Sequence, residues 1–280
     1  MIARQVGVLI NRPVHGVTPV GGGSICRAYR VTLADGAAVF AKMLDDPPPG
    51  IFAAEAAGLR WLGEAGAAPV PEVLAVTDEM LVLAWVAPGP PGRRGAEQLG
   101  RDLAGMHAAG AAGLGAAWPG YIGPLPLDNR ADVDWPEFYA TRRLLPYLRI
   151  AVDQGALSGE QARTIERVAE RIRDLAGPAE PPSRIHGDLW SGNVHWGADG
   201  RAWLIDPAAH GGHRETDLAM LALFGSHQLE RTVAAYHEAF PLADGWRDRV
   251  PLHQLHPLLV HAALFGGGYG ARAAAAASRY

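Results

Sequence analysis

Apolar and polar positions in the first third of the chain follow two different periods. Residues 28–33 and 37–44 place apolar side chains at alternate positions, and the turn ADG between them predicts a β-hairpin. Residues 51–66 instead repeat apolar side chains at helical spacing and end at a glycine. Two further short strands are predicted after this helix. The order strand, strand, helix, strand, strand predicts a small lobe formed by residues 1–87.

The remainder of the chain, residues 88–280, has mainly helical patterns. Helices are predicted over residues 95–110, 137–151 and 158–175, and a short strand over 201–207. We therefore predict an α+β, bilobal protein. An N-terminal antiparallel sheet with one helix is followed by a mainly helical C-terminal lobe.

The composition narrows the class of protein. It is ordinary for a globular chain, with 49% hydrophobic and 19% charged residues. The net charge of -4 offers no basic footprint for nucleic acid, and no apolar run is long enough to span a membrane. The start of the chain lacks a secretory signal pattern, and the single cysteine, Cys26, fits a reducing compartment. We predict a cytoplasmic protein that binds neither nucleic acid nor membranes, and we predict no particular oligomeric state.

The stretch RIHGDLWSGNV contains a histidine, an aspartate and an asparagine at fixed spacings. Asp, Ser, Gly and Asn all form turns, so an ordinary turn is one interpretation. The other is a kinase-type catalytic loop, H-R-D-x-x-x-x-N, in which the aspartate accepts the proton of the attacking hydroxyl and the asparagine binds a metal. His186, Asp188 and Asn193 match this pattern, with glycine in place of the arginine. Asp206 follows where the second metal ligand is expected.

Two departures from the protein-kinase pattern narrow this interpretation. The arginine of the catalytic loop is missing, and the triplet DFG is replaced by DPA. Both argue against a protein kinase controlled by a phosphorylated activation loop. They suit a small-molecule kinase of the same architecture.

The N-terminal lobe contains the order of residues expected for a nucleotide site. Its glycine-rich loop comprises Gly21, Gly22, Gly23 and Ser24. This loop matches neither G-x-x-x-x-G-K-[ST] nor a clean G-x-G-x-x-G, and alone it is equally a hairpin turn. Lys42 ends the next strand, and Glu55 lies on the predicted helix. In kinases, a lysine so placed holds the α- and β-phosphates and the glutamate positions the lysine.

Several stretches together resemble the fructosamine/ketosamine kinase family, which is similar to aminoglycoside phosphotransferases and choline kinases. They are HGDLWSGN, IDPAAHGGHRETDLAMLALFG, GGGSICRAYRV, FAAEAAGLRWL, YIGPLPLDN and HPLLVHAALFGGGYG. The tryptophan in the catalytic loop and the segment GHRETDLAM point to this family in particular. Aminoglycoside and choline kinases generally share only the His, Asp and Asn positions. The resemblance implies a protein-kinase-like fold.

The resemblance also implies an activity. ATP, with Mg²⁺, would donate its γ-phosphoryl group to a sugar hydroxyl of a fructosamine or ribulosamine, free or protein-bound, in the repair of glycated amines. Asp188 would be the base, with Asn193 and Asp206 as magnesium ligands. Lys42 and Glu55 would form an ion pair beside the nucleotide. The linker whose backbone meets adenine would comprise Ala84, Trp85 and Val86.

Other residues are assigned supporting or substrate roles. Asp217 resembles the helix aspartate that braces the catalytic loop, and His186 is expected to orient the loop rather than transfer a proton. Trp190 either stacks on the sugar or closes the core. His195, His210 and His213 show no metal-binding spacing, so structural or substrate-contacting roles are expected for them. Of these, His213, together with Glu215, is predicted to face the acceptor. A separate hypothesis is that oxidation of the cysteine in the glycine-rich segment hinders ATP binding.

Two other functions compete with this prediction. An aminoglycoside or choline-type metabolite phosphotransferase would use the same catalytic residues. An aminoglycoside calls for an acidic pocket, and the carboxylates of the C-terminal lobe are not concentrated in the sequence. A non-catalytic nucleotide-binding module is the third possibility, and the filled catalytic positions give it no support.

Overall fold

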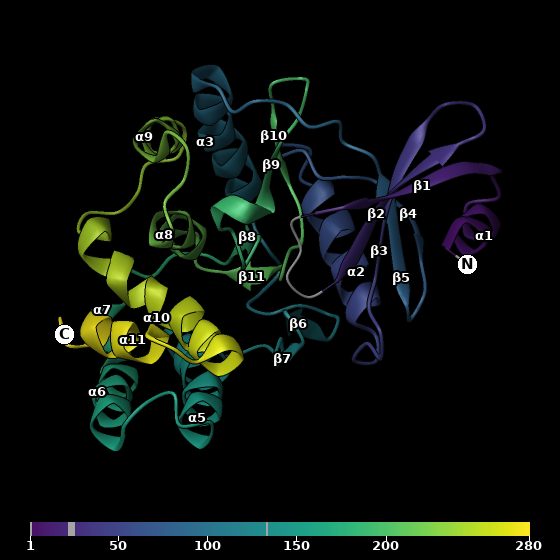
Figure 1. The fold of residues 1–280 in the computed structure, drawn as a ribbon. Coiled ribbons are helices and arrows are strands. Elements are labelled where there is room, and N and C mark those ends of the chain that lie inside the picture. The colour runs from purple at the N-terminus through teal and green to yellow at the C-terminus, as the bar shows by residue number, and fades with distance from the viewer. Residues whose placement is uncertain (1, 22–25, 133) are drawn as a thin grey trace.

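The N-terminal part of the chain is an antiparallel sheet with one helix against each face (Figure 1). The computed structural model describes residues 2–21, 26–132 and 134–280. Within these residues the sheet has five strands in the order β1-β2-β3-β5-β4. The elements are α1 (Ile2–Leu9), β1 (Val14–Val20), β2 (Arg27–Leu33), β3 (Ala38–Met43), α2 (Ile51–Gly63), β4 (Val73–Val76) and β5 (Met80–Ala84).

Alternating side chains on the strands build two small cores. Along β5, Met80 and Val82 join the core shared with α1, whereas Leu81 and Leu83 pack against α2. The predicted hairpin is present as β2 and β3. Helix α1 and strand β1 were not predicted from the sequence. Lys42 therefore lies on the central strand β3, between β2 and β5.

An extended segment connects the sheet to the helical part of the chain. Ala87 and Gly89 pair with Ala198 and Trp196 of the C-terminal part, through the bonds from Ala198 N to Ala87 O and from Gly89 N to Trp196 O, both 2.8 Å. Helix α3 begins at Arg93. A boundary between two lobes at residues 87 and 88 falls inside this connection, and we keep it as a proposed boundary.

The C-terminal part is mainly helical, as predicted. Its helices are α3 (Arg93–Ala108), α4 (Trp135–Phe138), α5 (Leu145–Asp153), α6 (Gly159–Glu170), α7 (Ile172–Leu175), α8 (Glu215–Leu223), α9 (Leu229–Ala239), α10 (Trp246–Phe265) and α11 (Tyr269–Ala277). Short two-stranded ribbons accompany them: β6 (Gly120–Ile122) with β7 (Leu125–Leu127), β8 (Ser183–Ile185) with β11 (His210–Gly212), and β9 (Val194–Trp196) with β10 (Ala202–Leu204). The chain thus belongs to the α+β class, with a sheet-based part followed by a helical part.

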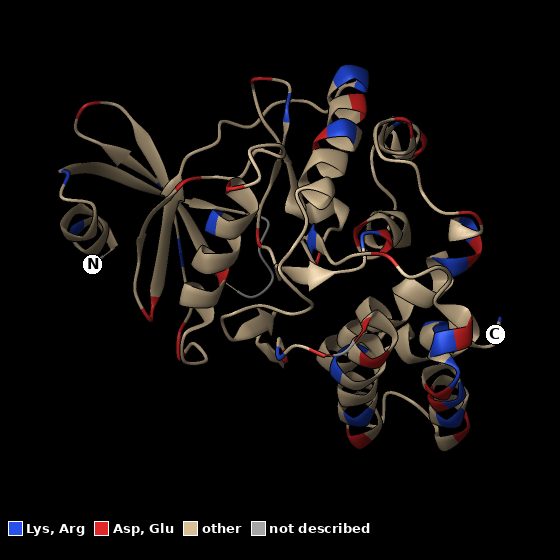
Figure 2. Ribbon diagram, turned by 180° about the vertical axis from the view of Figure 1, so that it is seen from behind, with Lys and Arg blue, Asp and Glu red and all other residues tan. Residues whose placement is uncertain are grey.

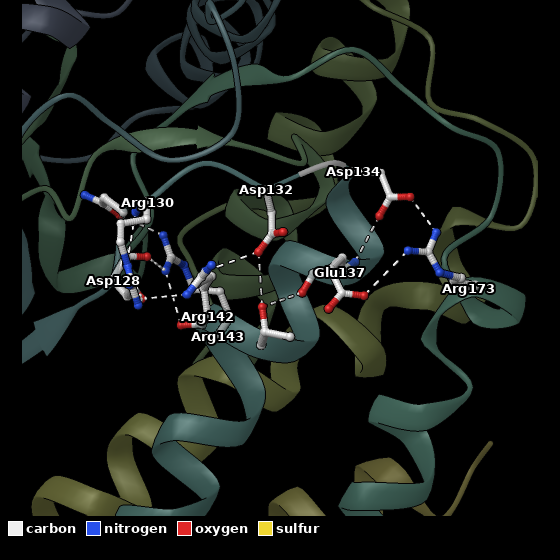
Figure 3. Close-up of polar contacts among 10 residues, drawn as sticks. Asp128, Arg130, Asp132, Asp134, Glu137, Arg142, Arg143 and Arg173 are labelled. Carbon is white, nitrogen blue, oxygen red and sulfur yellow. Dashed lines mark hydrogen bonds and ion pairs between the residues drawn. The ribbon is translucent and has the colours of Figure 1, made fainter.

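A π-helical turn, Tyr139–Leu144, joins α4 to α5. Figure 3 shows Arg142 of this turn between two carboxylates. Its Nη1 lies 3.0 Å from Asp128 Oδ2, and its Nε lies 3.2 Å from Asp132 Oδ2. The neighbouring Arg143 is buried and donates to Asp128 O and Asn129 Oδ1. These contacts fasten the segment after β7 to the helical core.

Charges of both signs are interspersed over the helices, and neither sign gathers on one side of the helical part (Figure 2). This agrees with the small net charge of -4. Within the described ranges, none of the helices combines the length and the apolar character needed to cross a bilayer.

Candidate active site

The predicted catalytic loop connects β8 to β9 and brings its aspartate and asparagine into direct contact. Asn193 Nδ2 donates to Asp188 O at 2.8 Å and to Asp188 Oδ2 at 3.1 Å. The same nitrogen lies 3.5 Å from Asp206 O. Because Nδ2 is turned toward Asp188, Oδ1 is the atom that Asn193 can offer to a cation. Asp188, Asn193 and Asp206, which the sequence singled out by their spacing, therefore lie in one continuous site.

The glycine that replaces arginine in this loop has a steric explanation. Gly187 has φ +82°, in the left-handed region that side chains disfavour. A Cβ atom there would lie 2.3 Å from Ala208 O, on the segment that follows Asp206. The loop therefore packs directly against that segment, and any side chain would force the two apart.

Lys42, Glu55 and Asp206 meet beside the catalytic loop. Lys42 Nζ lies 2.5 Å from Glu55 Oε2 and 2.9 Å from Asp206 Oδ1. Burial alone would lower the pKa of Lys42, but the charges of Asp206 and Glu55 raise it, so the lysine is a cation. Burial raises the pKa of Glu55 to about 7, against the opposing effect of Lys42. The structure therefore brings the predicted nucleotide-side pair together.

Asp188 and Asp206 repel each other when both are ionised. Burial, reinforced by the charge of Asp206, raises the pKa of Asp188 to about 8. A divalent cation held by Asp206 and Asn193 would screen this repulsion. Carboxylate and amide oxygens are also the ligands that Mg²⁺ prefers. The donor set therefore fits magnesium.

The backbone of the catalytic loop is held from below by Asp217 on α8. Its Oδ2 accepts from His186 N at 2.7 Å, and its Oδ1 accepts from Gly187 N at 2.9 Å. His186 is itself fully buried, donates from Nε2 to Ile205 O at 2.9 Å, and accepts from Asp188 N at 3.2 Å. Burial lowers the pKa of His186. Both residues therefore have contacts suited to supporting the loop.

One further partner of Asp217 was missed from the sequence. His107, near the end of α3, donates from Nε2 to Asp217 Oδ2 at 3.1 Å. A signal for it was present, because His107 continues the buried stripe of Leu99 and Leu103 at four-residue spacing. A polar residue on such a stripe needs a buried partner.

Only some of the other residues predicted to contact the nucleotide are described by the structure. Gly21 is exposed at the end of β1, whereas Gly22, Gly23 and Ser24 lie outside the described residues. In the linker, Ala84 ends β5, and Trp85 packs against Arg30, whose Cζ lies 5.4 Å from the ring centroid. Val86 O accepts from His195 Nε2 at 3.1 Å, which ties the linker to β9.

Helix α2, which contributes Glu55, is fastened at several points. A Cβ atom on Gly58 would lie 3.1 Å from Ala209 Cβ, so the helix packs closely on the segment after Asp206. Arg184, just before the catalytic loop, donates to Trp61 O and stacks over the Trp61 ring, with 4.4 Å from Cζ to the centroid. At the start of the helix, Tyr121 donates to Pro49 O at 2.9 Å. These contacts connect the ion pair to the catalytic loop.

The prediction that His213 and Glu215 face the acceptor is not supported, because both side chains are buried. They are 6% and 3% exposed. Glu215 accepts two bonds from Arg249, at 2.6 and 3.0 Å. His213, Glu215 and His253 lie close enough together to surround a cation. However, Arg249 occupies both carboxylate oxygens, and Nδ1 of His213 already accepts from Glu215 N.

We expect Glu215→Gln to destabilise the protein by about 3 kcal/mol at neutral pH, because it leaves the buried Arg249 without its counter-charge. Burial opposes ionisation, yet the nearby His253 and the bonds from Arg249 lower the pKa of Glu215 from 4.5 to about 2. The stabilisation is therefore fully present above pH 4.5 and is lost as pH falls toward about 2. Urea unfolding across this range measures it.

The exposed Glu238→Gln on α9 is the control for charge removal, and we expect it to leave the free energy of unfolding unchanged. Unchanged stability of Glu215→Gln, together with a raised KM for the acceptor, would instead restore Glu215 to the acceptor site.

Comparison with known proteins finds matches over almost the whole length of the chain. Residues 2–280 match the family model described as Fructosamine kinase. A Thermus thermophilus protein named "Probable ketoamine kinase" is 39% identical over 268 residues, covering 96% of this chain and 94% of that protein. The solved structure of a fructosamine-3-kinase candidate from Thermobifida fusca is 53% identical, with a TM-score of 0.95, and covers 99% of this chain and 97% of that one. Choline kinase from Streptococcus pneumoniae shares the fold, with a TM-score of 0.66 at 16% identity, covering 100% of this chain and 98% of that one.

Proposed function

Because the chain belongs to the fructosamine kinase family, we propose that it transfers the γ-phosphoryl group of ATP to a sugar hydroxyl of a ketosamine. The observation that carries this proposal is the contact of Asn193 with both Asp188 and Asp206, beside the Lys42–Glu55 ion pair. Phosphoryl transfer requires mainly positioning and charge neutralisation, and this arrangement supplies both.

Each of these residues has a proposed role. Asp188 orients the attacking hydroxyl and accepts its proton. Asn193 and Asp206 hold Mg²⁺, which neutralises negative charge on the phosphates when it is bound. Lys42, held by Glu55, provides the fixed positive charge for the nucleotide phosphates.

The remaining nucleotide contacts keep their predicted assignments. The backbone of the linker faces adenine, and the residues concerned are Ala84, Trp85 and Val86. Contact with the phosphates stays assigned to the glycine-rich segment, that is to Gly21 and to Gly22, Gly23 and Ser24 outside the described residues. A cytoplasmic location also remains a prediction.

We place the acceptor beside Trp190. This side chain projects from the catalytic loop and is 39% exposed, so it is available to a ligand. Its ring lies edge-on to Phe224, at 6.2 Å between centroids, and Phe224 in turn packs against His261 at 4.9 Å. Ligand sites are commonly lined by aromatic side chains with a few polar groups. We therefore favour stacking on the sugar over closure of the core as the role of Trp190.

An aminoglycoside or choline-type acceptor remains the alternative. Solved structures of a spectinomycin phosphotransferase and of a choline kinase share the fold of this chain at low identity, which supports the architecture but no particular acceptor. Two relatives that match most of the chain, from Thermus thermophilus and Enterococcus faecium at 39% and 34% identity, are named for ketoamines. This difference favours the ketosamine.

The test is ADP release from Mg-ATP across a panel of acceptors: fructosyl-lysine, ribulosyl-lysine, kanamycin, choline and homoserine. We expect stimulation by the two ketosamines, and loss of that stimulation in Asp188→Asn. Stimulation by kanamycin or choline alone would overturn the acceptor while keeping the catalytic residues. Binding of ATP without turnover on any acceptor would favour the non-catalytic module.

A further inference from the structure

The hydroxyl of Tyr236 lies at the far end of a hydrogen-bond chain that leads to the catalytic loop. Tyr236 is fully buried on α9, and its hydroxyl lies 2.8 Å from His107 Nδ1. The other ring nitrogen of His107 contacts Asp217, which holds the backbone N–H groups of His186 and Gly187. Tyr236 is thus two side chains away from the loop that positions Asp188.

The direction of each bond in this chain is fixed by its ends. An ionised Asp217 can only accept, so His107 must donate to it from Nε2. Burial raises the pKa of Tyr236 despite the charge of the nearby Arg214, so its hydroxyl keeps a proton to donate. The Tyr236 hydroxyl therefore donates to His107 Nδ1, whose imidazole hydrogen lies on Nε2, facing Asp217.

The alternative tautomer of His107 would disrupt these hydrogen bonds. With hydrogen on Nδ1, the lone pair of Nε2 would face the Asp217 carboxylate at 3.1 Å, and no bond could form. The carboxylate is fully buried, so a missing donor is costly and favours a shifted loop. Asp217 and the Tyr236 hydroxyl thus favour the same tautomer, and without the hydroxyl only Asp217 holds it.

We propose that Tyr236 is a positioning residue for phosphoryl transfer: through His107 and Asp217 it fixes the backbone from which Asp188 projects. The significance for catalysis rests on the proposed function above. The geometric part stands on the hydrogen bonds alone, and it can be measured without turnover.

Tyr236→Phe keeps the buried ring and removes the hydroxyl. We expect kcat to fall by about tenfold, because a small displacement of a catalytic group has an effect of this order or more. KM for ATP and for the acceptor should stay within about twofold, since neither ligand contacts Tyr236. The matched control is Thr232→Val, which removes another buried bond between α9 and α3, from Thr232 Oγ1 to Ala96 O. It should cost similar stability and leave kcat unchanged.

A double-mutant cycle distinguishes an effect on the His107 tautomer from a general loss of packing around Tyr236. The side-chain amide of His107→Gln donates to Asp217 whatever Tyr236 does, so Tyr236→Phe should cause no further loss of kcat in that background. An additional tenfold loss there would overturn the proposal. So would equal kcat values for Tyr236→Phe and Thr232→Val.

Hydrogen exchange of the wild-type chain and both single variants gives the readout that does not depend on activity. Tyr236→Phe should speed exchange of the amides of His186 and Gly187, whereas Thr232→Val should not. Unchanged exchange in Tyr236→Phe would overturn the proposal. If the wild type turned over no ketosamine while this exchange difference appeared, the proposed function would fail and the positioning role of Tyr236 would stand.

Discussion

Asp188→Asn is expected to lower kcat by about 10³-fold without unfolding the protein. A positioned general base contributes on the order of 10² to 10⁴ in rate, and Asp188 occupies the base position. Asparagine has the same shape and still offers an oxygen to Asn193 Nδ2. The folded state raises the pKa of Asp188 from 3.8 to about 8, so its ionised form destabilises the fold at neutral pH. The variant should therefore be at least as stable as the wild type.

The measurement is ketosamine-dependent ADP release together with thermal unfolding of the same samples. The exposed Asp153→Ala, near the end of α5, removes an aspartate far from any proposed role and serves as the control. Near-normal turnover by Asp188→Asn would remove Asp188 as the base. A lower Tm would show that its role is structural.

Asp206→Asn is expected to have the second largest effect, about a 10²-fold loss of kcat with a higher Mg²⁺ requirement. Asp206 adopts φ +53°, a left-handed conformation that asparagine tolerates better than alanine. The substitution therefore removes the charge while keeping the backbone. It also removes one of the two carboxylates at Lys42, leaving Glu55 as its partner.

Titration of activity with Mg²⁺ at saturating ATP tests this expectation. If Asp206 is a metal ligand, added Mg²⁺ should recover part of the activity of the variant. An unchanged Mg²⁺ dependence would mean that Asp206 acts on Lys42 alone. Wild-type kcat in the variant would exclude Asp206 from the site.

The sequence predicted those parts of the fold that have strong local patterns. The β2–β3 hairpin and α2 were found because alternation and helical spacing are clear in them. Strand β1 was missed because Gly16 and Pro19 interrupt its pattern. Such residues are tolerated on an edge strand, and β1 is the edge of the sheet. Strand β1 forms because it pairs with β2, not because its own residues strongly favour a strand.

The site shows the same division between local and distant contacts. Asp188 and Asn193 are five residues apart, so their contact could be inferred from spacing alone. Arg249 lies 34 residues from Glu215, so this pair could not be inferred from local spacing, and Glu215 was instead predicted to face the acceptor. The contact of Asp217 with His107 was missed for the same reason, because the two residues lie 110 positions apart.

The burial of Lys42 affects how readily this protein can itself be glycated. Lys42 is the single lysine in the sequence, where arginine supplies the other 24 of the 25 basic residues. Reducing sugars add to unprotonated, accessible amines, and this amine is buried, charged and bonded to two carboxylates. The folded chain therefore offers no free side-chain amine. An enzyme that we propose to act on glycated amines is itself built to escape glycation of its lysine.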